Sequence, residues 1–323
     1  MNIGIIGAGN IAEKMAVTIN QLDGIFNYAI ASRDLQKAKV FQEKFGVQKA
    51  YGSYEELLQD EEVDLVYIAT VHSTHYPIML LCLQYRKPVL CEKIFTTSLR
   101  DTIDIYKKFE EKGLFVAEAL WTSFLPSRKI IEELLYKKKV IGEVVGMESW
   151  FRIPIQNVER IKRKDLGGGA VMDIGVYPIS FTFRTLGFDY KSVNIYGVEC
   201  NEYGADLQEI IEFEYDKGIK AVCVIETTSS YPLTVTICGE KGKMVINHVN
   251  CPVQIEVFDN NNQLVECIEC APSLGGFEYQ VLACKKALEE GKLECSEWSH
   301  ANSIAVSQIV DKTLKMAENI NLV

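Results

Sequence analysis

Two stretches of the sequence place side chains where they could take part in catalysis. KPVLCEKI puts Glu92 and Lys93 directly after an apolar run, and LGGGAVMDIGVYPISF contains Asp173 and Tyr177 four residues apart. Desolvating an ammonium is costly, so a lysine at the end of a buried strand either reaches solvent or has a specific partner. Residues four apart share one face of a helix, although Pro178 disfavours helical geometry at Tyr177 and predicts a kink.

A glycine-rich turn lies at the start of the chain. In GIIGAGNIA, an apolar run leads into Gly7, Gly9 and Ala12, and a helix is expected to begin at Asn10. The first glycine permits a tight turn, the second lets a pyrophosphate approach the backbone, and the small third residue allows helix and strand to pack closely. The helix N-terminus at Asn10 and Ile11 faces the phosphate charge. The motif predicts a dinucleotide site.

The end of the second predicted strand bears on which dinucleotide binds. A carboxylate there would accept hydrogen bonds from the ribose 2′-hydroxyl and favour NAD, but this chain has Ser32 and Arg33 in IASRD. A hydroxyl and a guanidinium suit a 2′-phosphate, so the sequence favours NADP. NAD stays an alternative, in which Arg33 stacks on adenine and Asp34 contacts the ribose.

A parallel sheet is needed to position these motifs. Near-continuous apolar runs separated by helical patterns predict such a sheet, with both faces covered. Its ligand crevice lies at the carboxyl ends of the strands, so Lys93 and Thr70, which follow two of them, are expected near the reactive end of the cofactor. The predicted strands are 2–7, 28–32, 63–70, 87–92 and 114–120, and the helices 10–22, 34–45, 74–85 and 98–112.

After about Trp121 the pattern changes to consecutive strands with hairpin-length gaps, which predict an antiparallel sheet. A helix is expected from about Pro126 to Lys139, a helical segment after the glycines at 167–169, and two more helices at about 277–290 and 300–318. The strand-like runs between them are 143–153, 192–200, 207–215, 219–228, 233–239, 243–248 and 253–259.

Taken together, several motifs resemble those of the Gfo/Idh/MocA oxidoreductases. They are GIIGAGNIA, ASR, KPVLCEKI, EALWTSFLP and GGGAVMDIGVYPISF, and they look most like the branch of dimeric dihydrodiol and NADP-dependent xylose dehydrogenases. The resemblance implies an α/β protein with an N-terminal Rossmann domain, residues 1–121. It also implies a substrate-binding and oligomerisation α+β domain, residues 122–323, with a large, mostly antiparallel open sheet. An alternative for the last helix is that it packs against the first domain.

The resemblance also assigns residues. The family's Glu-Lys-Pro motif maps onto 92–94, where Ile94 replaces the proline, and its aspartate with a His or Tyr partner maps onto Asp173 and Tyr177. An arginine is common where Ser123 stands. Trp121 either flanks the nicotinamide or packs at a domain junction. The cofactor-binding residues predicted from the motifs and the resemblance are Gly7, Gly9, Asn10, Ile11, Ser32, Arg33, Thr70, His72, His75, Glu92, Lys93 and Trp121.

Oxidising an alcohol requires a base for the hydroxyl proton while a hydride leaves toward nicotinamide. A phenol with a pKa near 10 is only about 0.1% ionised at pH 7, but a nearby ammonium favours the phenolate. We therefore interpret Tyr177 as the general acid/base and Lys93 as the group that tunes it and hydrogen-bonds the substrate oxygen. Asp173 would orient the substrate or Lys93. The alternative is a packed Tyr177 and a solvated Lys93.

Composition limits the partners. Lys and Arg number 34 against 44 Asp and Glu, and a net charge of −10 argues against a nucleic-acid partner. No window approaches the roughly 18 apolar residues of a membrane span, and the N-terminus does not read as a signal peptide, so we expect a cytoplasmic protein. The single C-x-x-C pair, Cys267 and Cys270, predicts no metal site. We expect a sugar, polyol or diol substrate and a homodimer or higher oligomer through the second sheet.

Two other functions and one segment stay open at this stage. The protein could bind NADP as a regulator without turnover, which the set Lys93, Asp173 and Tyr177 argues against. It could also be a methyltransferase, but Ser32 and Arg33 fit that poorly because an acidic residue is expected for the ribose of S-adenosylmethionine. The basic run ERIKRKD, residues 159–165, is either a substrate loop or a solvated face.

Overall fold

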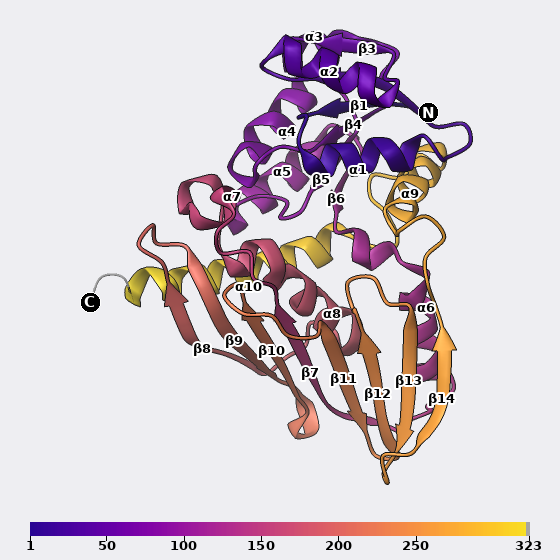
Figure 1. Cartoon of the computed structure of the whole chain (residues 1–323), viewed down its shortest axis with the longest axis vertical. Helices are drawn as coiled ribbons and strands as arrows, with labels where there is room; N and C mark the ends of the chain where they lie inside the picture. Colours follow the sequence, from indigo (N-terminus) through magenta and orange to yellow (C-terminus); the bar gives the residue numbers. More distant parts are fainter. Residues whose placement is uncertain (321–323) are drawn as a thin grey trace. The chain divides into compact units, whose positions relative to one another are not determined.

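The computed structural model describes residues 1–320, and its contacts divide the chain into two units (Figure 1). The first unit comprises Met1–Phe124 and Phe277–Ile304, and the second comprises Leu125–Gly276 and the residues from Ala305 on. The second division falls inside the last helix, α10 (His300–Ile320). Each unit is built on its own sheet.

The first unit contains a parallel sheet, which confirms the predicted Rossmann architecture. Among the described residues its strand order is β3-β2-β1-β4-β5-β6, with every neighbouring pair parallel. The order reverses between β1 and β4, and this switch point is where such sheets bind ligands. The strands are β1 (Asn2–Ile6), β2 (Phe26–Ala31), β3 (Lys49–Tyr51), β4 (Leu65–Ile68), β5 (Val89–Glu92) and β6 (Val116–Ala119).

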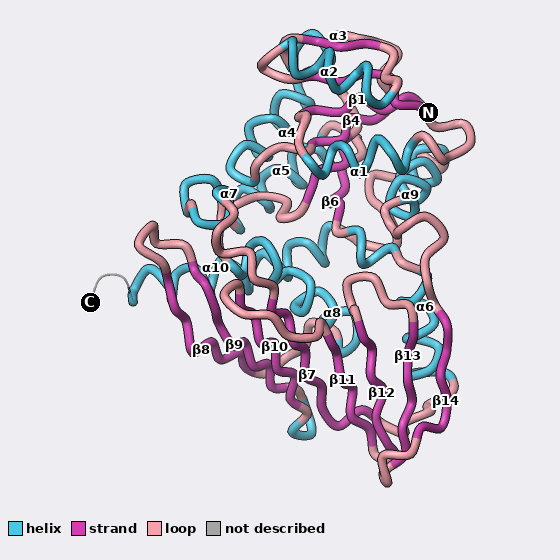
Figure 2. Tube along the Cα trace, in the orientation of Figure 1, coloured by secondary structure: helices cyan, strands magenta, loops and turns pink. Residues whose placement is uncertain are grey.

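Helices flank this sheet (Figure 2). Three of them begin at side chains that cap the first turn: Asp34 before α2, Ser53 before α3 and Ser98 before α5. The helices are α1 (Asn10–Ile19), α2 (Leu35–Phe45), α3 (Tyr54–Gln59), α4 (His75–Gln84), α5 (Leu99–Glu111) and α9 (Glu278–Glu289), with short 3-10 turns η1 (His72–Thr74) and η2 (Trp121–Phe124).

A buried carboxylate on β6 joins the segment Phe277–Ile304 to the sheet of the first unit. Trp298 Nε1 and Ser303 Oγ donate to Glu118 Oε2 at 3.1 and 2.6 Å, and the Phe95 N–H donates to Oε1 at 3.0 Å. His300 Nε2 adds a contact of 2.8 Å to the carbonyl oxygen of Val116. Three donors on one carboxylate offset the cost of burying its charge.

The second unit contains a mostly antiparallel sheet, as predicted. Its order among the described residues is β14-β13-β12-β11-β7-β10-β9-β8, and β7 with β10 is the parallel pair. The strands are β7 (Val144–Arg152), β8 (Ser192–Cys200), β9 (Asp206–Glu214), β10 (Lys220–Glu226), β11 (Thr234–Gly239), β12 (Gly242–Asn247), β13 (Gln254–Asp259) and β14 (Leu264–Glu269).

One face of this sheet packs against helices. Met147, Ser149 and Phe151 of β7 are buried, whereas Trp150 between them is partly exposed on the other face. The helical elements are α6 (Pro126–Glu132), the π-turn η3 (Glu133–Lys137), α7 (Glu159–Lys162), the 3-10 turn η4 (Lys164–Leu166), the π-turn η5 (Val171–Gly175), α8 (Val176–Leu186), the 3-10 turn η6 (Asp216–Gly218) and the later part of α10.

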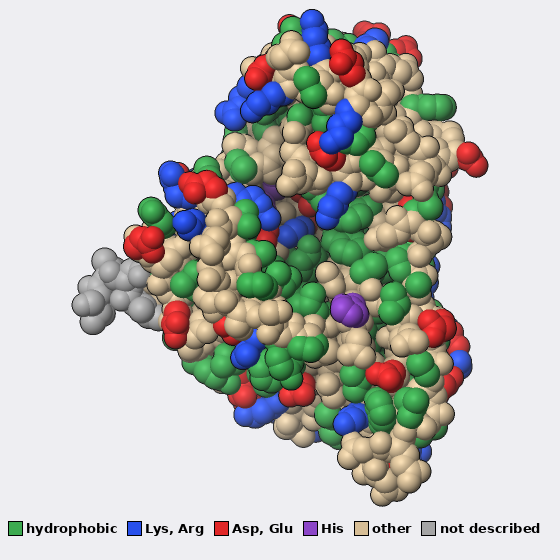
Figure 3. Space-filling view, in the orientation of Figure 1, with side chains coloured by type: hydrophobic (Ala, Val, Ile, Leu, Met, Phe, Trp, Pro, Cys, Tyr) green, Lys and Arg blue, Asp and Glu red, His purple; other side chains and the backbone are tan. Residues whose placement is uncertain are grey.

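Two surface properties of the described residues bear on function. Acidic and basic side chains are interspersed over the face drawn in Figure 3. No helix within residues 1–320 combines the length and apolar character that crossing a bilayer requires.

Candidate functional site

The glycine turn between β1 and α1 has the geometry of an anion cradle. Gly7 has φ +101°, and a Cβ there would lie 2.7 Å from the carbonyl oxygen of Ala69, so the turn requires glycine. A Cβ at Gly9 would meet no described atom within 4 Å, and no described side chain caps α1. The first-turn N–H groups at Asn10 and Ile11 are therefore available to a pyrophosphate. These residues fit a bound dinucleotide.

At the end of β2, the acidic residue is already engaged. Asp34 Oδ1 accepts hydrogen bonds from the backbone N–H of Gln36 at 2.9 Å and of Lys37 at 3.4 Å, which caps α2. Ser32 Oγ accepts from the Asp34 N–H at 3.3 Å, and Arg33 is exposed. The strand end thus presents a half-buried hydroxyl and an exposed guanidinium, beside an exposed carboxylate that already accepts two backbone hydrogen bonds.

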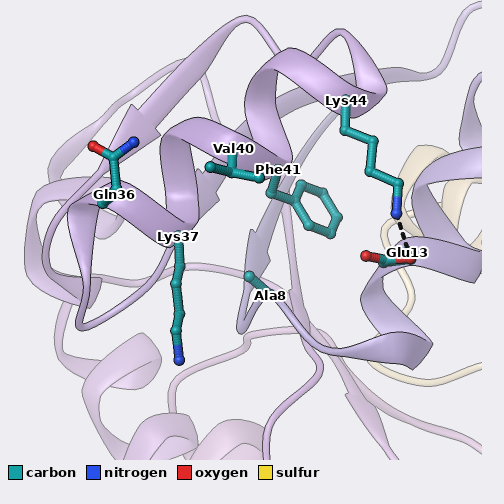
Figure 4. A pocket seen from close by; sticks show the side chains of 7 residues that line it. All are labelled: Ala8, Glu13, Gln36, Lys37, Val40, Phe41 and Lys44. Carbon is teal, nitrogen blue, oxygen red and sulfur yellow. Dashed lines mark hydrogen bonds and ion pairs between the residues drawn. The ribbon is translucent and has the colours of Figure 1, made fainter.

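A pocket of about 220 Å³ lies between the glycine turn and α2 (Figure 4). Ala8 of the turn lines the pocket, and Lys37 lines it from the first turn of α2. The sequence motifs did not single out Lys37, although a basic residue in the first turn of the helix after the second strand is a signal that could have found it. The lining residues are Ala8, Glu13, Gln36, Lys37, Val40, Phe41 and Lys44.

His75 holds together the loops that follow β4 and β5. Its ring nitrogens contact the carbonyl oxygens of Ile94, at 2.9 Å, and Thr70, at 3.1 Å, and the side chain is fully buried. Burial lowers the pKa of His75, so the neutral ring is favoured. His72 is also buried and lies edge-on to His75, with ring centroids 5.7 Å apart. Thr70 is half-buried at the loop start.

Lys93 sits beside two buried carboxylates at the ends of β5 and β6. Tyr67 Oη donates to Glu92 Oε1 at 2.5 Å, and the backbone N–H of Lys93 donates to Oε2 at 3.3 Å. Burial raises the pKa of Glu92 to about 7, against the opposing effects of the Tyr67 hydrogen bond and the Lys93 charge. Burial also raises the pKa of Glu118, and the Lys93 charge again opposes it.

This arrangement explains a lysine at the end of a buried strand. Lys93 is half-buried, and its positive charge favours the ionised forms of the neighbouring Glu92 and Glu118. The Lys93–Ile94 peptide bond, where the family has a proline, is cis.

Trp121, in η2 at the end of the Rossmann sheet, packs within the first unit. Its indole stacks on Phe277 with ring centroids 4.7 Å apart and the planes 15° from parallel. The ring is 9% exposed.

Asp173 and Tyr177 lie on successive helical turns of the second unit. Residues 171–175 form the π-turn η5 and α8 begins at Val176, so Pro178 falls in the first turn of α8, where proline is tolerated. The expected disturbance at Pro178 is thus accommodated by a π-turn before it. Asp173 is buried, while Tyr177 is half-buried and stacks on Phe151 with ring centroids 5.9 Å apart.

The triple glycine before η5 makes room for a buried carboxylate. Gly169 has φ +116°, and a Cβ there would overlap Asp206 Oδ1. Asp206 Oδ2 accepts a hydrogen bond of 2.6 Å from the Val171 N–H, so it caps the helical segment that carries Asp173. The neighbouring Glu209 is also buried. Burial, followed by the charge of Asp206, raises the pKa of Glu209 well above its usual range.

No cluster of three or more metal-ligating side chains occurs among the described residues. Cys267 is exposed and Cys270 is buried, so the two cysteines of the C-x-x-C pair occupy different environments.

Replacing each of the two glycines of the turn by alanine is predicted to change a different property, stability for Gly7 and NADPH affinity for Gly9. Gly7→Ala forces a left-handed backbone on alanine and a clash with Ala69, so thermal unfolding shows a loss of at least about 1–2 kcal/mol. Gly9→Ala leaves the melting temperature near that of the wild type but weakens NADPH binding about tenfold or more, as measured by NADPH fluorescence. Unchanged NADPH affinity in a folded Gly9→Ala protein contradicts the cradle.

Replacing Glu209 is predicted to change how stability depends on pH. A carboxyl with a raised pKa is protonated in the folded chain but ionised in the unfolded chain above about pH 4.3, so the wild type loses stability as pH rises through this window. Glu209→Gln removes this loss, so its advantage in urea unfolding grows as the pH rises above about 4.3, by up to about 1.4 kcal/mol per pH unit.

The matched control is Glu212→Gln, on the same strand, whose carboxylate pairs with Lys220 at 2.9 Å. This control keeps the wild-type pH dependence. Parallel pH profiles for Glu209→Gln and the wild type contradict a protonated Glu209.

Comparison with known families and proteins agrees with this architecture. Residues 1–120 match the oxidoreductase family with an NAD-binding Rossmann fold, GFO_IDH_MocA, and residues 133–245 match the GFO/IDH/MocA C-terminal domain. The chain is 33% identical to trans-1,2-dihydrobenzene-1,2-diol dehydrogenase of Xenopus laevis over 97% of this chain and 96% of that protein. Identity to the Xenopus tropicalis enzyme of the same name is 32%, with the same coverage.

Solved structures share the fold over almost the whole chain. A 3-ketoreductase from Actinomadura kijaniata in complex with NADP and TDP-benzene has a TM-score of 0.86 and 25% identity, with 96% of each chain covered. An oxidoreductase from Agrobacterium radiobacter in complex with NAD+, L-tartaric acid and magnesium has a TM-score of 0.82 and 18% identity, covering 99% of this chain and 96% of that one. With a nucleotide-binding Rossmann unit and a full-length likeness to dehydrogenases, this chain belongs to the Gfo/Idh/MocA family of NAD(P)-binding oxidoreductases.

Proposed function

We propose that this protein is an NADP-dependent dehydrogenase or reductase acting on a carbinol or carbonyl group of a sugar, cyclitol or trans-dihydrodiol. The observation that carries the proposal is the half-buried Lys93 at the carboxyl end of β5, offset by buried Glu92 and Glu118. An ammonium fixed at the ligand edge of a Rossmann sheet is suited to donating a hydrogen bond to a substrate oxygen. Membership of an oxidoreductase family argues against the methyltransferase and against a non-catalytic regulator.

The proposed chemistry divides the work among three side chains. The bound nicotinamide supplies the hydride acceptor or donor. Tyr177 takes the proton from the substrate hydroxyl during oxidation and returns it during reduction, as a general base and acid. Lys93 donates a hydrogen bond to the same oxygen and stabilises negative charge on it and on the phenolate. Asp173 orients the substrate.

The proposed preference for NADP has support at the end of β2. Ser32 and Arg33 offer a hydroxyl and a guanidinium, and Lys37 supplies a second cation that lines the pocket beside Ala8 of the glycine turn. The carboxylate of Asp34 is committed to capping α2. A 2′-phosphate is recognised by such a group of donors, whereas an unmodified ribose prefers a free carboxylate. The 3-ketoreductase structure contains NADP.

The proposed substrate class follows the relatives. The curated relatives act, by name, on trans-1,2-dihydrobenzene-1,2-diol, and the structural neighbour is a 3-ketoreductase in complex with NADP and TDP-benzene. Solved forms of that ketoreductase include one with a lysine replaced by alanine and one with a tyrosine replaced by phenylalanine. A vicinal diol or a sugar carbinol offers a second hydroxyl group, which Asp173 is suited to accept a hydrogen bond from.

Replacing either proposed catalytic side chain is predicted to abolish turnover without loss of cofactor. With a substrate chosen from a panel of aldoses, inositols and trans-dihydrodiols, Tyr177→Phe and Lys93→Met each lower kcat by about a hundredfold or more, as expected for loss of proton transfer. NADPH fluorescence shows cofactor binding within about threefold of the wild type. Tyr196→Phe, at an exposed tyrosine of β8, is the control and keeps full activity.

Near-normal turnover by Tyr177→Phe or Lys93→Met, with NADPH bound, contradicts the catalytic assignment. Absence of wild-type turnover across the whole panel contradicts the substrate class.

The choice of cofactor is tested at Arg33. Arg33→Ala is predicted to weaken NADPH binding about tenfold and to leave NADH binding nearly unchanged, because the lost contact is to the 2′-phosphate. Arg100→Ala, at an exposed arginine of α5, leaves both affinities as they are. Equal losses for NADPH and NADH at Arg33 would mean that its guanidinium stacks on adenine instead.

A homodimer through the open face of the second sheet is also part of the proposal. Trp150 and Tyr231 lie on this face with ring centroids 5.3 Å apart, and the Arg152 guanidinium lies over both rings. Aromatic and arginine side chains that are at least partly exposed on a surface, as Trp150, Tyr231 and Arg152 are, are typical of interface cores.

Sedimentation equilibrium is expected to give a multiple of the 36.4 kDa chain mass, with two chains favoured. Trp150→Glu places a charge on the middle strand of the face and shifts the mass to that of one chain, while circular dichroism stays unchanged. A wild-type protein that sediments as a single chain contradicts this arrangement.

A further inference from the structure

In the basic segment Glu159–Asp165, the side chain of Arg160 pairs with a buried carboxylate. Arg160, in α7, donates from Nη1 to Asp173 Oδ1 at 2.7 Å and from Nη2 to Oδ2 at 3.4 Å. The Asp173 side chain is 6% exposed and that of Arg160 is 45% exposed. The guanidinium therefore reaches from solvent to a buried carboxylate that lies one turn from Tyr177.

The backbone around Arg160 is hydrogen-bonded to the triple glycine, residues 167–169, that precedes η5. The Gly169 N–H donates to the Ile161 carbonyl at 3.0 Å and the Gly168 N–H donates to the Arg163 carbonyl at 3.0 Å. Asn201 Nδ2 donates to the Lys162 carbonyl at 3.0 Å, and Ile161 is buried. These contacts hold Arg160 at a set distance from Asp173, which favours a structured loop over a freely solvated face.

Other charged residues of the basic segment pair at the surface. Arg163 makes two hydrogen bonds of 2.7 Å to Asp165, with the Asp165 side chain 61% exposed. Lys164 pairs with the exposed Glu318 at 2.9 Å. Exposed pairs contribute little, whereas a charge on a buried carboxylate depends strongly on its partner. Arg163 thus provides a matched comparison for Arg160.

We propose that Arg160 is a positioning residue for the reaction: its guanidinium fixes the orientation in which the Asp173 carboxylate meets the substrate. The inference rests on the proposed role of Asp173. A planar guanidinium with two donors sets both the place and the rotation of a carboxylate, which a single ammonium does not. Arg160 is then part of the substrate-binding site, whereas Arg163 and Lys164 pair at the surface.

Steady-state kinetics of Arg160→Gln with the panel substrate and NADPH or NADP test this role. We expect kcat/KM to fall about ten- to hundredfold, as a misplaced orienting group does. Arg160→Lys recovers part of the loss, and millimolar guanidinium chloride restores activity to Arg160→Ala because the site is open to solvent. Arg163→Gln, and guanidinium added to Arg163→Ala, change nothing.

A double variant separates this inference from the proposed function. If Arg160 acts through Asp173, Arg160→Gln combined with Asp173→Asn is no slower than Asp173→Asn alone. Full activity of Asp173→Asn overturns the proposed role of Asp173. If Asp173→Asn loses activity but Arg160→Gln is as active as Arg163→Gln, the inference about Arg160 is overturned and the proposed role of Asp173 stands.

Hydrogen–deuterium exchange of the apoprotein gives a readout that needs no turnover. Arg160→Gln is expected to raise exchange in the peptide spanning 169–177 at least about threefold, and Arg163→Gln is expected not to. Equal exchange in the two variants, together with equal kinetics, contradicts a positioning role.

Discussion

The burial of two carboxylates at the carboxyl ends of neighbouring strands is the constraint on which the first unit depends. Glu92 and Glu118 would each be costly to bury alone, and each has gathered donors around it. Glu118 accepts a hydrogen bond from Trp298, and in this way the segment Phe277–Ile304 is joined to the sheet of the first unit. Glu92 engages Tyr67, and the remaining negative charge accounts for Lys93 at this edge.

In the second unit, too, buried carboxylates with hydrogen-bond donors lie on and next to the helical segment that leads to Tyr177. Asp206, buried beneath the triple glycine, accepts the Val171 N–H and fixes the start of the helical segment. Asp173 on that segment is buried as well, and its charge meets the guanidinium of Arg160. In both units, then, a buried carboxylate with matched donors fixes a segment that carries one of the proposed catalytic side chains, so charge compensation as well as hydrophobic packing sets the positions of these segments.

Sequence predicted the features that depend on local chemistry. The turn at 7–9 and the apolar strands of the parallel sheet are such cases, because glycine spacing and hydrophobic periodicity are properties of short segments. β3 (Lys49–Tyr51) was missed because three residues with one exposed give no clear period. Trp298 and Ser303, two of the partners of Glu118, lie 180 and 185 residues away from it, and the pairing of Arg160 with Asp173 depends on how a loop folds back. The rules of helix formation predict that Pro178 disturbs the helix at Tyr177, but they do not show how the chain accommodates the disturbance. In the structure a π-turn, η5, precedes Pro178.

The central proposal is that Lys93 and Tyr177 act on one substrate oxygen. The most direct test is a crystal structure of the protein with NADP+ and an unreactive polyol bound. The account predicts that Lys93 Nζ and Tyr177 Oη each lie about 2.6–3.2 Å from the same hydroxyl oxygen, next to the nicotinamide ring. A complex in which the two atoms are too far apart to share that oxygen, more than roughly 7 Å, would contradict it.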